Sequence, residues 1–182
     1  ETGLFVDVIL PLALPGAFTY HVSSAERNQV EVGKRVIVQF GRRKYYSAII
    51  YKVHHDQPEG YRTKPVQTVL DEQPVINRYQ LSLWEWIARY YMCTMGDVYK
   101  AAMPSGLKLE SETLITPNLQ IEFDESALND HEFLVWEALE QHAPLSIDQV
   151  NEITGLKNSM RLIYQMLGKR LILLQEELKT GY

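Results

Sequence analysis

The densest run of cationic side chains in the sequence, Arg42–Lys44, lies directly before two tyrosines, Tyr45 and Tyr46. Arginine and lysine bind phosphate oxygens, and aromatic rings stack on nucleobases, where each stacking contact contributes roughly 1–3 kcal/mol. Upstream, the apolar segment Leu10–Tyr20 ends in Phe-Thr-Tyr and adds further aromatic surface. Cations, aromatic rings and a turn glycine that permits close approach of the backbone together favour the binding of a nucleic-acid end.

Each of these features also has an interpretation that involves no ligand. A bare run of cations is most often the solvated tip of a hairpin, and Gly41 is explained by the turn alone. Phe18 and Tyr20 flank Thr19, so in a strand both rings point away from the threonine side chain, into a core or toward a pocket. Lys64 stands at the start of a β-rich run, where a lone lysine is normally solvated. Both interpretations stay open at this point.

The sequence holds no pattern typical of an enzyme. It contains none of the motifs GxxxxGK[ST], GxGxxG, GxSxG and HExxH, which disfavours phosphate-loop, dinucleotide-dependent, serine-hydrolase and zinc-protease chemistry. The five histidines show no metal-ligand spacing, and the single cysteine, Cys93, excludes an intrachain disulfide and a cysteine-based zinc site. We therefore expect no catalytic residue, no metal and no cofactor within this chain.

The charge of the chain is unevenly distributed. Residues 1–105 hold twelve Lys and Arg against ten Asp and Glu, whereas residues 106–182 hold six against thirteen. The net charge of −5 therefore combines a slightly basic first part with a strongly acidic second part. Because positive charge attracts phosphate, a nucleic-acid contact is expected in the first part. No apolar run approaches the roughly 20 residues of a membrane span, so we expect no membrane partner.

Alternating apolar residues and tight turns predict a β-rich first domain over residues 1–106. Within residues 35–40, for example, Val36, Val38 and Phe40 fall on one face of a strand. Proline and glycine separate the predicted strands, which are Leu4–Leu10, Ala17–Val22, Arg35–Phe40, Tyr45–Val53 and Lys64–Leu70. Short strands joined by short turns favour a strongly curved sheet or partial barrel.

A C-terminal helix completes this first domain. Asn77 is its predicted N-cap, and an apolar stripe runs through Leu81, Trp84, Ala88 and Tyr91. A neighbouring stripe widens the apolar arc and consists of Leu83, Ile87 and Tyr90. So wide an arc predicts a helix that is buried on most sides.

Residues 107–182 have the pattern of a winged-helix domain. An edge strand or pair of strands is predicted within Thr113–Phe123. Three helices and a final strand follow, predicted at His131–His142, from the capping box at Ser146 to Gly155, at Asn158–Lys169 and at Leu171–Leu174. In the first helix, Leu134 and Val135 are expected to face the core. Three short helices followed by a strand are typical of winged-helix folds, so the whole chain is assigned to the α+β class.

Few side chains of the third helix in this domain suit the recognition of DNA bases. Asn158, Arg161 and Gln165 are the only good candidates for contacts with base edges. The surrounding acidic charge leaves two alternatives open, a weak DNA contact and a module that packs against protein.

An ordered series of segments in the first domain resembles one family. The segments are VILPLALPGAFTY, VGKRVIVQFGRRK, KPVQTVLDEQPV, WIARYY and GDVYKAAMPSGLK. In this order they are similar to the N-terminal region of the primosomal protein N′ family, the bacterial replication-restart helicases known as PriA. The resemblance covers about residues 4–108, and the winged-helix pattern follows where that family has its winged-helix domain.

The resemblance implies that this region binds the 3′ end of the nascent leading strand at a stalled replication fork. The family's full-length protein is an ATP-dependent 3′-to-5′ DNA helicase with a zinc-binding cysteine region, and those parts lie outside this chain. ATP, Mg²⁺ and zinc are therefore expected only there. The chain itself is expected to bind branched DNA with a free 3′ end without ATPase activity, in the bacterial cytoplasm at the nucleoid.

The resemblance also implies a set of residues for a 3′-end pocket. In the family, a Phe-Asp pair, a glycine after a strand and a lysine before a later strand form this pocket; by motif they fall on Phe18, Thr19, Gly41 and Lys64. Thr19 departs from the family's aspartate. A carboxylate accepts a strong hydrogen bond from a 3′-hydroxyl, whereas a threonine hydroxyl accepts a weaker one and can also donate. We therefore expect lower selectivity for a 3′-hydroxyl over a 3′-phosphate.

Two further surfaces follow from the same comparison. The hairpin tip is expected to attract DNA phosphates without sequence preference, through Arg42, Arg43 and Lys44. The family also docks the acidic C-terminal tail of single-stranded-DNA-binding protein, one of several primosome partners. The W-x-x-x-Y-Y match places this docking surface at Trp86, Arg89 and Tyr90.

A hypothesis from another class remains beside this one. The chain can be a protein-interaction scaffold, in which Trp86 and Tyr90 hold a partner peptide and the acidic winged helix only packs against other proteins. Salt separates the two hypotheses, because DNA binding weakens steeply through counterion release and apolar peptide docking does not.

Overall fold

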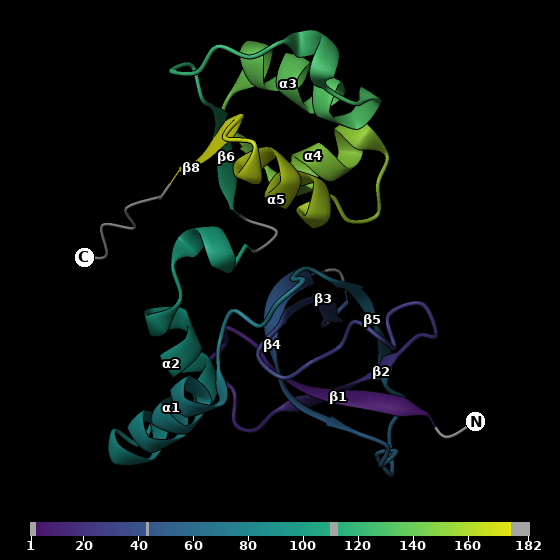
Figure 1. The fold of residues 1–182 in the computed structure, drawn as a ribbon, viewed down its shortest axis with the longest axis vertical. Helices are drawn as coiled ribbons and strands as arrows, with labels where there is room; N and C mark the ends of the chain where they lie inside the picture. Colours follow the sequence, from purple (N-terminus) through teal and green to yellow (C-terminus); the bar gives the residue numbers. More distant parts are fainter. Residues whose placement is uncertain (1–2, 43, 110–112, 176–182) are drawn as a thin grey trace. The chain divides into compact units, whose positions relative to one another are not determined.

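In the computed structural model, residues 3–42, 44–109 and 113–175 are described. The chain divides between Lys108 and Leu109 into two compact units. In Figure 1 the strands of the first unit are purple to blue and its helices teal, whereas the second unit runs from green to yellow.

Five strands of the first unit form a closed barrel. They are β1 (Leu4–Ile9), β2 (Phe18–Val22), β3 (Arg35–Phe40), β4 (Lys44–His54) and β5 (Lys64–Val69). Their order around the barrel is β1-β2-β5-β3-β4, and β4 pairs back onto β1. All these neighbours are antiparallel except β2 and β5, which run parallel. The predicted curved β sheet is confirmed, and the β1–β4 pairing closes it completely.

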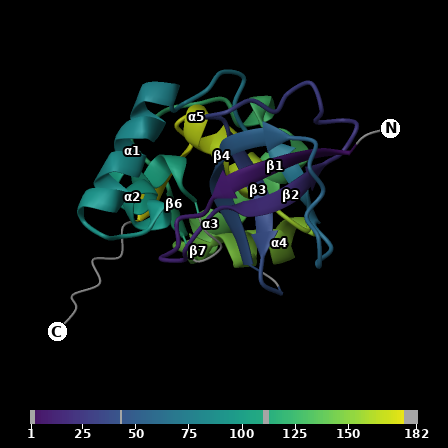
Figure 2. The same ribbon diagram turned by 90° about the horizontal axis from the view of Figure 1, so that it is seen from below.

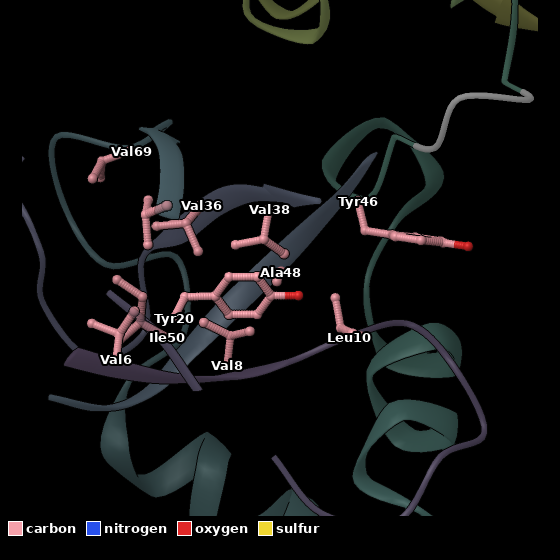
Figure 3. Packing of buried hydrophobic residues seen from close by; sticks show 11 residues of the cluster. Val6, Val8, Leu10, Tyr20, Val36, Val38, Tyr46, Ala48, Ile50 and Val69 are labelled. Carbon is pink, nitrogen blue, oxygen red and sulfur yellow. The ribbon is translucent and has the colours of Figure 1, made fainter. Parts of the chain in front are cut away.

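Alternate residues of the strands point into the barrel and form its core. Val6 and Val8 of β1 and Val36 and Val38 of β3 are fully buried there. The ring of Tyr20 lies among these valines (Figure 3). The period of two that predicted the strands is therefore also the pattern that fills the barrel.

Two helices, α1 (Arg78–Tyr90) and α2 (Met95–Ala102), lie side by side next to the barrel (Figure 2), and a short 3₁₀ helix, η1 (Ser105–Leu107), follows them. The predicted N-cap of α1 is confirmed: the Asn77 side chain accepts a hydrogen bond from the Gln80 backbone at 2.9 Å, and Gln80 returns one. Thr94 caps α2 in the same way through Asp97. These caps satisfy backbone N–H groups that have no partner within a helix.

One face of α1 is buried and the other is open to solvent. Leu81, Trp84 and Ala88 are buried, as the first predicted stripe required. Tyr91 from that stripe is 69% exposed, and Tyr90 from the neighbouring stripe is 65% exposed. The prediction of a helix buried on most sides is wrong, because α2 and the barrel cover only one face of α1 within this unit.

A buried ion pair joins β3 to the segments that follow β5 and α2. The Arg35 guanidinium donates to both carboxylate oxygens of Asp71, with Nη2 2.6 Å from Oδ1 and Nε 3.0 Å from Oδ2. The backbone N–H of Arg35 donates to the same carboxylate at 2.8 Å. Arg35 Nη1 reaches the backbone oxygen of Leu107 at 3.2 Å. Charged groups this deeply buried need such complete pairing, because an unpaired one is expensive.

The second unit combines three helices with a small antiparallel sheet. Its elements are β6 (Leu114–Pro117), η2 (Glu125–Ala127), α3 (Asp130–His142), β7 (Leu145–Ser146), α4 (Ile147–Thr154), α5 (Met160–Gly168) and β8 (Ile172–Gln175). The sheet order is β7-β6-β8, so β6 is the central strand and the prediction of an edge strand there is wrong. Within the predicted segment Thr113–Phe123, only Leu114–Pro117 is strand. Phe123 lies outside the strand and packs edge-on against Trp136.

In this unit, the caps of α4 were predicted correctly from the sequence. Ser146 and Gln149 form the predicted capping box of α4, and Gly155 ends the helix at a φ of 69°. The prediction for α3 is partly wrong: Val135 is buried, but Leu134 is 42% exposed and Glu132 is buried in its place. Lys169 makes that burial possible, because its ammonium lies 2.7 and 2.8 Å from the two Glu132 oxygens.

Among the helices within the described residues, none is both long and apolar enough to cross a membrane.

Replacing Gly33 by alanine tests the packing between the barrel and the chain before α1. Gly33 and Gly60 both have a φ of +90°, but a Cβ on Gly33 would lie 1.8 Å from the Ile76 carbonyl oxygen, whereas one on Gly60 would meet no atom within 4 Å. Gly60→Ala should cost about 1–2 kcal/mol of unfolding free energy from backbone strain. Gly33→Ala should cost roughly 1–3 kcal/mol more, through overpacking. Urea unfolding measures both, and equal losses would contradict the predicted contact.

The phenol of Tyr20 should resist ionisation. Burial, and in second place Tyr61, raise the pKa of Tyr20 from 10.0 to about 12. Its hydroxyl donates to the Gln39 backbone oxygen at 3.1 Å, a bond that needs the neutral phenol. The raised pKa means that this stabilisation is complete below pH 10.0 and is lost as the pH rises toward about 12.

Alkaline titration of tyrosinate absorbance should therefore show a late part near pH 12 whose amplitude falls by one tyrosine in Tyr20→Phe. The late part should shrink without vanishing, because the hydrogen bond to Glu85, and in second place burial, also raise the pKa of Tyr51. Tyr79→Phe, which changes a tyrosine that is 87% exposed, should leave that late part in place. A late amplitude that is unchanged in Tyr20→Phe would contradict the raised pKa of Tyr20.

Candidate nucleic-acid interface

A pocket opens at one end of the barrel, where β2 begins, β3 ends and β5 begins. Its volume is about 220 Å³. It is lined by Phe18, Thr19, Tyr20, Gln39, Phe40, Gly41, Tyr61, Arg62, Thr63 and Lys64. The structure thus brings together Phe18, Thr19, Gly41 and Lys64, the four residues that the sequence placed in a 3′-end pocket.

The strand order explains why these distant segments meet. In the parallel β2–β5 pair, Tyr20 lies opposite Lys64, which puts the start of β2 beside the start of β5. In the β3–β5 pair, Val38 lies opposite Val66, which brings the end of β3 to the same place. Since each strand advances about 3.3 Å per residue, residues one or two positions beyond these pairs still lie at the same end of the barrel.

Aromatic rings form one wall of the pocket. Phe18 packs edge-on against Phe40, with ring centroids 4.9 Å apart, and Phe40 packs edge-on against Tyr46 at 6.4 Å. Phe18 is only half-buried, so both interpretations of this residue hold at once: it packs against the barrel core and it lines the pocket. An edge-to-face pair of this kind holds a ring in a defined orientation.

Gly41 and Lys64 line the same pocket. Gly41 has a φ of 70°, and a Cβ added to it would meet no atom within 4 Å. The space beside its α-carbon, where a side chain would lie, is therefore open. The Lys64 ammonium donates a hydrogen bond to the Gly41 carbonyl. An ammonium has three donors, so this bond fixes the position of Lys64 while two N–H groups remain for an anion.

Thr19 forms a hydrogen bond with Asp7, a residue that was not predicted from the sequence to belong to the site. Its hydroxyl donates to Asp7 Oδ1 at 2.7 Å, and His54 Nε2 lies 3.1 Å from the same oxygen. Asp7 is directly opposite Thr19 in the β1–β2 pairing. Asp7 is the one charged residue within β1. Its partner Thr19 is fixed only by the register of the β1–β2 pairing, so the sequence alone did not reveal this contact.

The lining residues that come from the polar loop before β5 were also missed. Tyr61 and Arg62 are exposed, and Thr63 follows them at the end of the polar loop before β5. His21 Nδ1 lies 3.1 Å from the Thr63 backbone oxygen and so ties this loop to β2. The combination of a tyrosine and an arginine at the rim was visible in the sequence but carried no spacing signal.

The hairpin tip presents fewer aromatic rings to solvent than its composition suggested. Arg42 is exposed, Lys44 begins β4, and Arg43 lies outside the described residues. Tyr46 belongs to the barrel core and Tyr45 is half-buried, so the interpretation of both rings as a stacking surface is wrong for Tyr46. The reason is the strand period, which turns every second residue of β4 inward.

The predicted docking residues lie together on the exposed face of α1. Trp86 and Tyr90 stack with ring centroids 5.1 Å apart, and Trp86 is 57% exposed. Arg89 is exposed on the same helix. This face is therefore accessible within the first unit.

The third helix of the winged-helix unit offers few side chains for DNA. Arg161 and Gln165 are exposed, but the Asn158 side chain accepts a hydrogen bond from the Met160 backbone at 2.9 Å. Lys169 is held by the buried Glu132. These contacts leave Arg161 and Gln165 as the base-edge candidates on α5.

The described part of the chain contains no group of three or more His, Cys, Asp and Glu side chains that could hold a metal ion.

Comparisons with known proteins agree with this geometry. Residues 7–104 match the family of the PriA 3′DNA-binding domain, and residues 112–177 match a winged helix domain. The second match confirms the predicted winged-helix fold.

Three similar proteins are each named replication restart protein PriA. The chain is 25% identical over 105 residues to the protein of Treponema pallidum, 31% over 104 residues to that of Haemophilus influenzae and 25% over 111 residues to that of Bacillus subtilis. These matches cover 56–59% of the chain but only 14–16% of the length of the relatives. Because residues 7–104 make up more than half of its 182 residues, the chain belongs to the PriA 3′DNA-binding domain family.

Proposed function

We propose that the barrel binds the 3′-terminal nucleotide of a DNA strand in the pocket at the end of β2, β3 and β5. The observation that carries this proposal is the convergence of Phe18, Thr19, Gly41 and Lys64 on one pocket from three separate segments. The match of this unit to a 3′DNA-binding domain supports the same ligand. The pocket offers an aromatic wall, an open backbone and a cation, which suit a base, a sugar and a phosphate.

Each residue has a distinct part in this proposal. The Phe18 ring packs against the terminal base, and Thr19 hydrogen-bonds the 3′-hydroxyl. Gly41 lets the sugar approach the backbone closely, since its outer side is open. Lys64, held by the Gly41 carbonyl, pairs with the phosphate that links the last two nucleotides. The exposed cations Arg62, which lines the pocket, and Arg42 and Lys44 of the tip add attraction without sequence preference. Arg43, which lies outside the described residues, is proposed to do the same.

The relatives suggest where such an end would occur. Their name, replication restart protein, supports a role for this chain at stalled forks, where the ligand is branched DNA with a free 3′ end on the nascent leading strand. We infer that any helicase activity, with its ATP, Mg²⁺ and zinc, belongs to regions other than the two domains of this chain. The chain alone then acts as a DNA-binding part without catalysis, in the bacterial cytoplasm.

The exposed face of α1 supports a second, separate contact. Stacked Trp86 and Tyr90 with Arg89 offer an apolar surface beside a positive charge. We propose that this face docks the acidic, apolar C-terminal tail of single-stranded-DNA-binding protein. If the chain were only an interaction scaffold, this face would carry all of its binding and the pocket none.

Forks with and without a leading-strand 3′ end at the junction should separate the two functions. Affinity for the fork with a free 3′-hydroxyl should be higher, and the preference should persist when all affinities fall with added salt, since counterion release acts on both forks. Fluorescence anisotropy at several salt concentrations measures this. Equal affinities for the two forks would rule out the pocket as an end-binding site.

Two single substitutions should locate the binding to the pocket. Phe18→Ala should remove a stacking contact worth about 1–3 kcal/mol and so weaken binding roughly 5- to 150-fold. Lys64→Ala should remove one phosphate contact and reduce the salt slope by about one. The matched controls are Tyr79→Ala and Lys100→Ala, which remove an exposed aromatic ring and an exposed lysine elsewhere in the first unit. Normal binding by both pocket variants would contradict the proposal.

A further inference from the structure

Thr19 and Asp7 form a hydrogen-bonded pair beside the pocket. They are direct neighbours across the antiparallel β1–β2 pairing, and the Thr19 hydroxyl lies 2.7 Å from Asp7 Oδ1. Thr19 lines the pocket, whereas Asp7, whose side chain is 23% exposed, is not among the lining residues. His54 Nε2 lies 3.1 Å from the same carboxylate oxygen, and the His54 side chain is only 12% exposed.

The direction of the Thr19–Asp7 hydrogen bond is fixed by chemistry. An ionised carboxylate can only accept, so the single hydroxyl hydrogen of Thr19 must point to Asp7. A hydroxyl that has used its hydrogen offers only its lone pairs to any further partner. Because the bond is assisted by the charge of Asp7, the threonine is held in this state more firmly than by a neutral acceptor.

His54 adds to the orientation of the carboxylate. Because an ionised carboxylate only accepts, Nε2 is the donor to Asp7, and within the described residues the buried Nδ1 of His54 has no hydrogen-bond partner. Two donors, on β2 and at the end of β4, therefore converge on one oxygen of Asp7. This convergence keeps the carboxylate in place and makes it a rigid support for Thr19.

We propose that Asp7 determines which chemical group the pocket accepts at the 3′ position, by making Thr19 an obligate hydrogen-bond acceptor. A 3′-hydroxyl can donate to Thr19 and is accepted. A 3′-phosphate has only acceptors and negative charge toward Thr19, so it finds no donor there and is repelled by Asp7 one hydrogen bond away. This inference rests on the proposed binding of a DNA 3′ end in the same pocket.

The inference changes the expectation drawn from the residue types alone. A free threonine hydroxyl would serve a 3′-hydroxyl and a 3′-phosphate about equally, since it can accept or donate. Paired with Asp7, it discriminates between them in the way that a carboxylate does. Asp7 is a positioning residue here, since it acts on the ligand through Thr19.

The test compares oligonucleotides that end in a 3′-hydroxyl, a 3′-hydrogen or a 3′-phosphate. The wild-type chain should prefer the hydroxyl to each of the other two roughly tenfold or more, as expected for losing a hydrogen bond to a charge-supported acceptor. Asp7→Asn should keep the shape of the pair but remove its charge, and should lose most of the preference over the 3′-phosphate. Thr19→Val should lose the preference over the 3′-hydrogen while its affinity for the 3′-hydrogen oligonucleotide stays near that of the wild type.

An exchange variant checks that the effect is one of charge and polarity. In Asp7→Thr with Thr19→Asp, the carboxylate and hydroxyl change places across the same strand pair, and the preference for the 3′-hydroxyl should be retained. Thr19→Asp alone should bind more weakly, because two carboxylates would then lie directly opposite each other.

The possible outcomes separate the inference about Asp7 from the proposed binding of a DNA 3′ end. A wild-type chain that binds all three ends equally, while it still prefers the fork with a 3′ end at the junction, would overturn the inference and leave end binding standing. A wild-type chain without that fork preference would overturn 3′-end binding in this pocket and the inference with it. A wild-type preference that survives intact in Asp7→Asn would overturn the role of Asp7 and leave end binding standing. If Asp7→Asn does not fold, Thr19→Val and the exchange variant decide, and an unchanged preference in Thr19→Val would overturn the inference.

Discussion

The position of β2 is the constraint on which the candidate pocket depends. Three consecutive side chains of this strand each hold a different neighbour: Thr19 bonds Asp7 of β1, Tyr20 bonds the backbone of β3 at Gln39, and His21 bonds Thr63 just before β5. Only two residue pairs join β2 to β5 along the parallel ladder, so these side-chain bonds supplement a short backbone connection. If β2 shifted by one residue, every one of its side chains would face the opposite side of the sheet.

Core and pocket therefore share their residues. Phe18 packs on Phe40 and through it on Tyr46, which belongs to the barrel core. Tyr20 has its ring in the same core and is also one of the residues that line the pocket. A binding site built on rigid strands keeps its geometry without a ligand, which lowers the entropy lost on binding. The end of the barrel can thus recognise a chain end with few contacts.

How much the sequence predicted depends on how local each signal was. The alternation of Val36, Val38 and Phe40 and the caps at Asn77 and Ser146 lie within a few residues, and these elements were predicted to within a residue or two. Non-local features were less accessible. The pairing of β4 with β1 closes the barrel, the central position of β6 follows from two partners far along the chain, and the exposed side of α1 depends on what packs against it. The role of Asp7 needed the strand register, whereas the four pocket residues came from resemblance to a family and not from periodicity.

The contacts of Arg35 bear on where the first domain ends as a folding unit. The carbonyl of Leu107 accepts from Arg35 Nη1 and from the Ser47 hydroxyl at 3.3 Å, although Leu107 is the last residue of η1 and lies beyond α2. A polypeptide cut before this residue would retain every strand and both helices of the domain but would leave a guanidinium N–H and a hydroxyl inside the protein without their acceptor. The segment that follows α2 is therefore part of the barrel's structure as well as a link to the second unit.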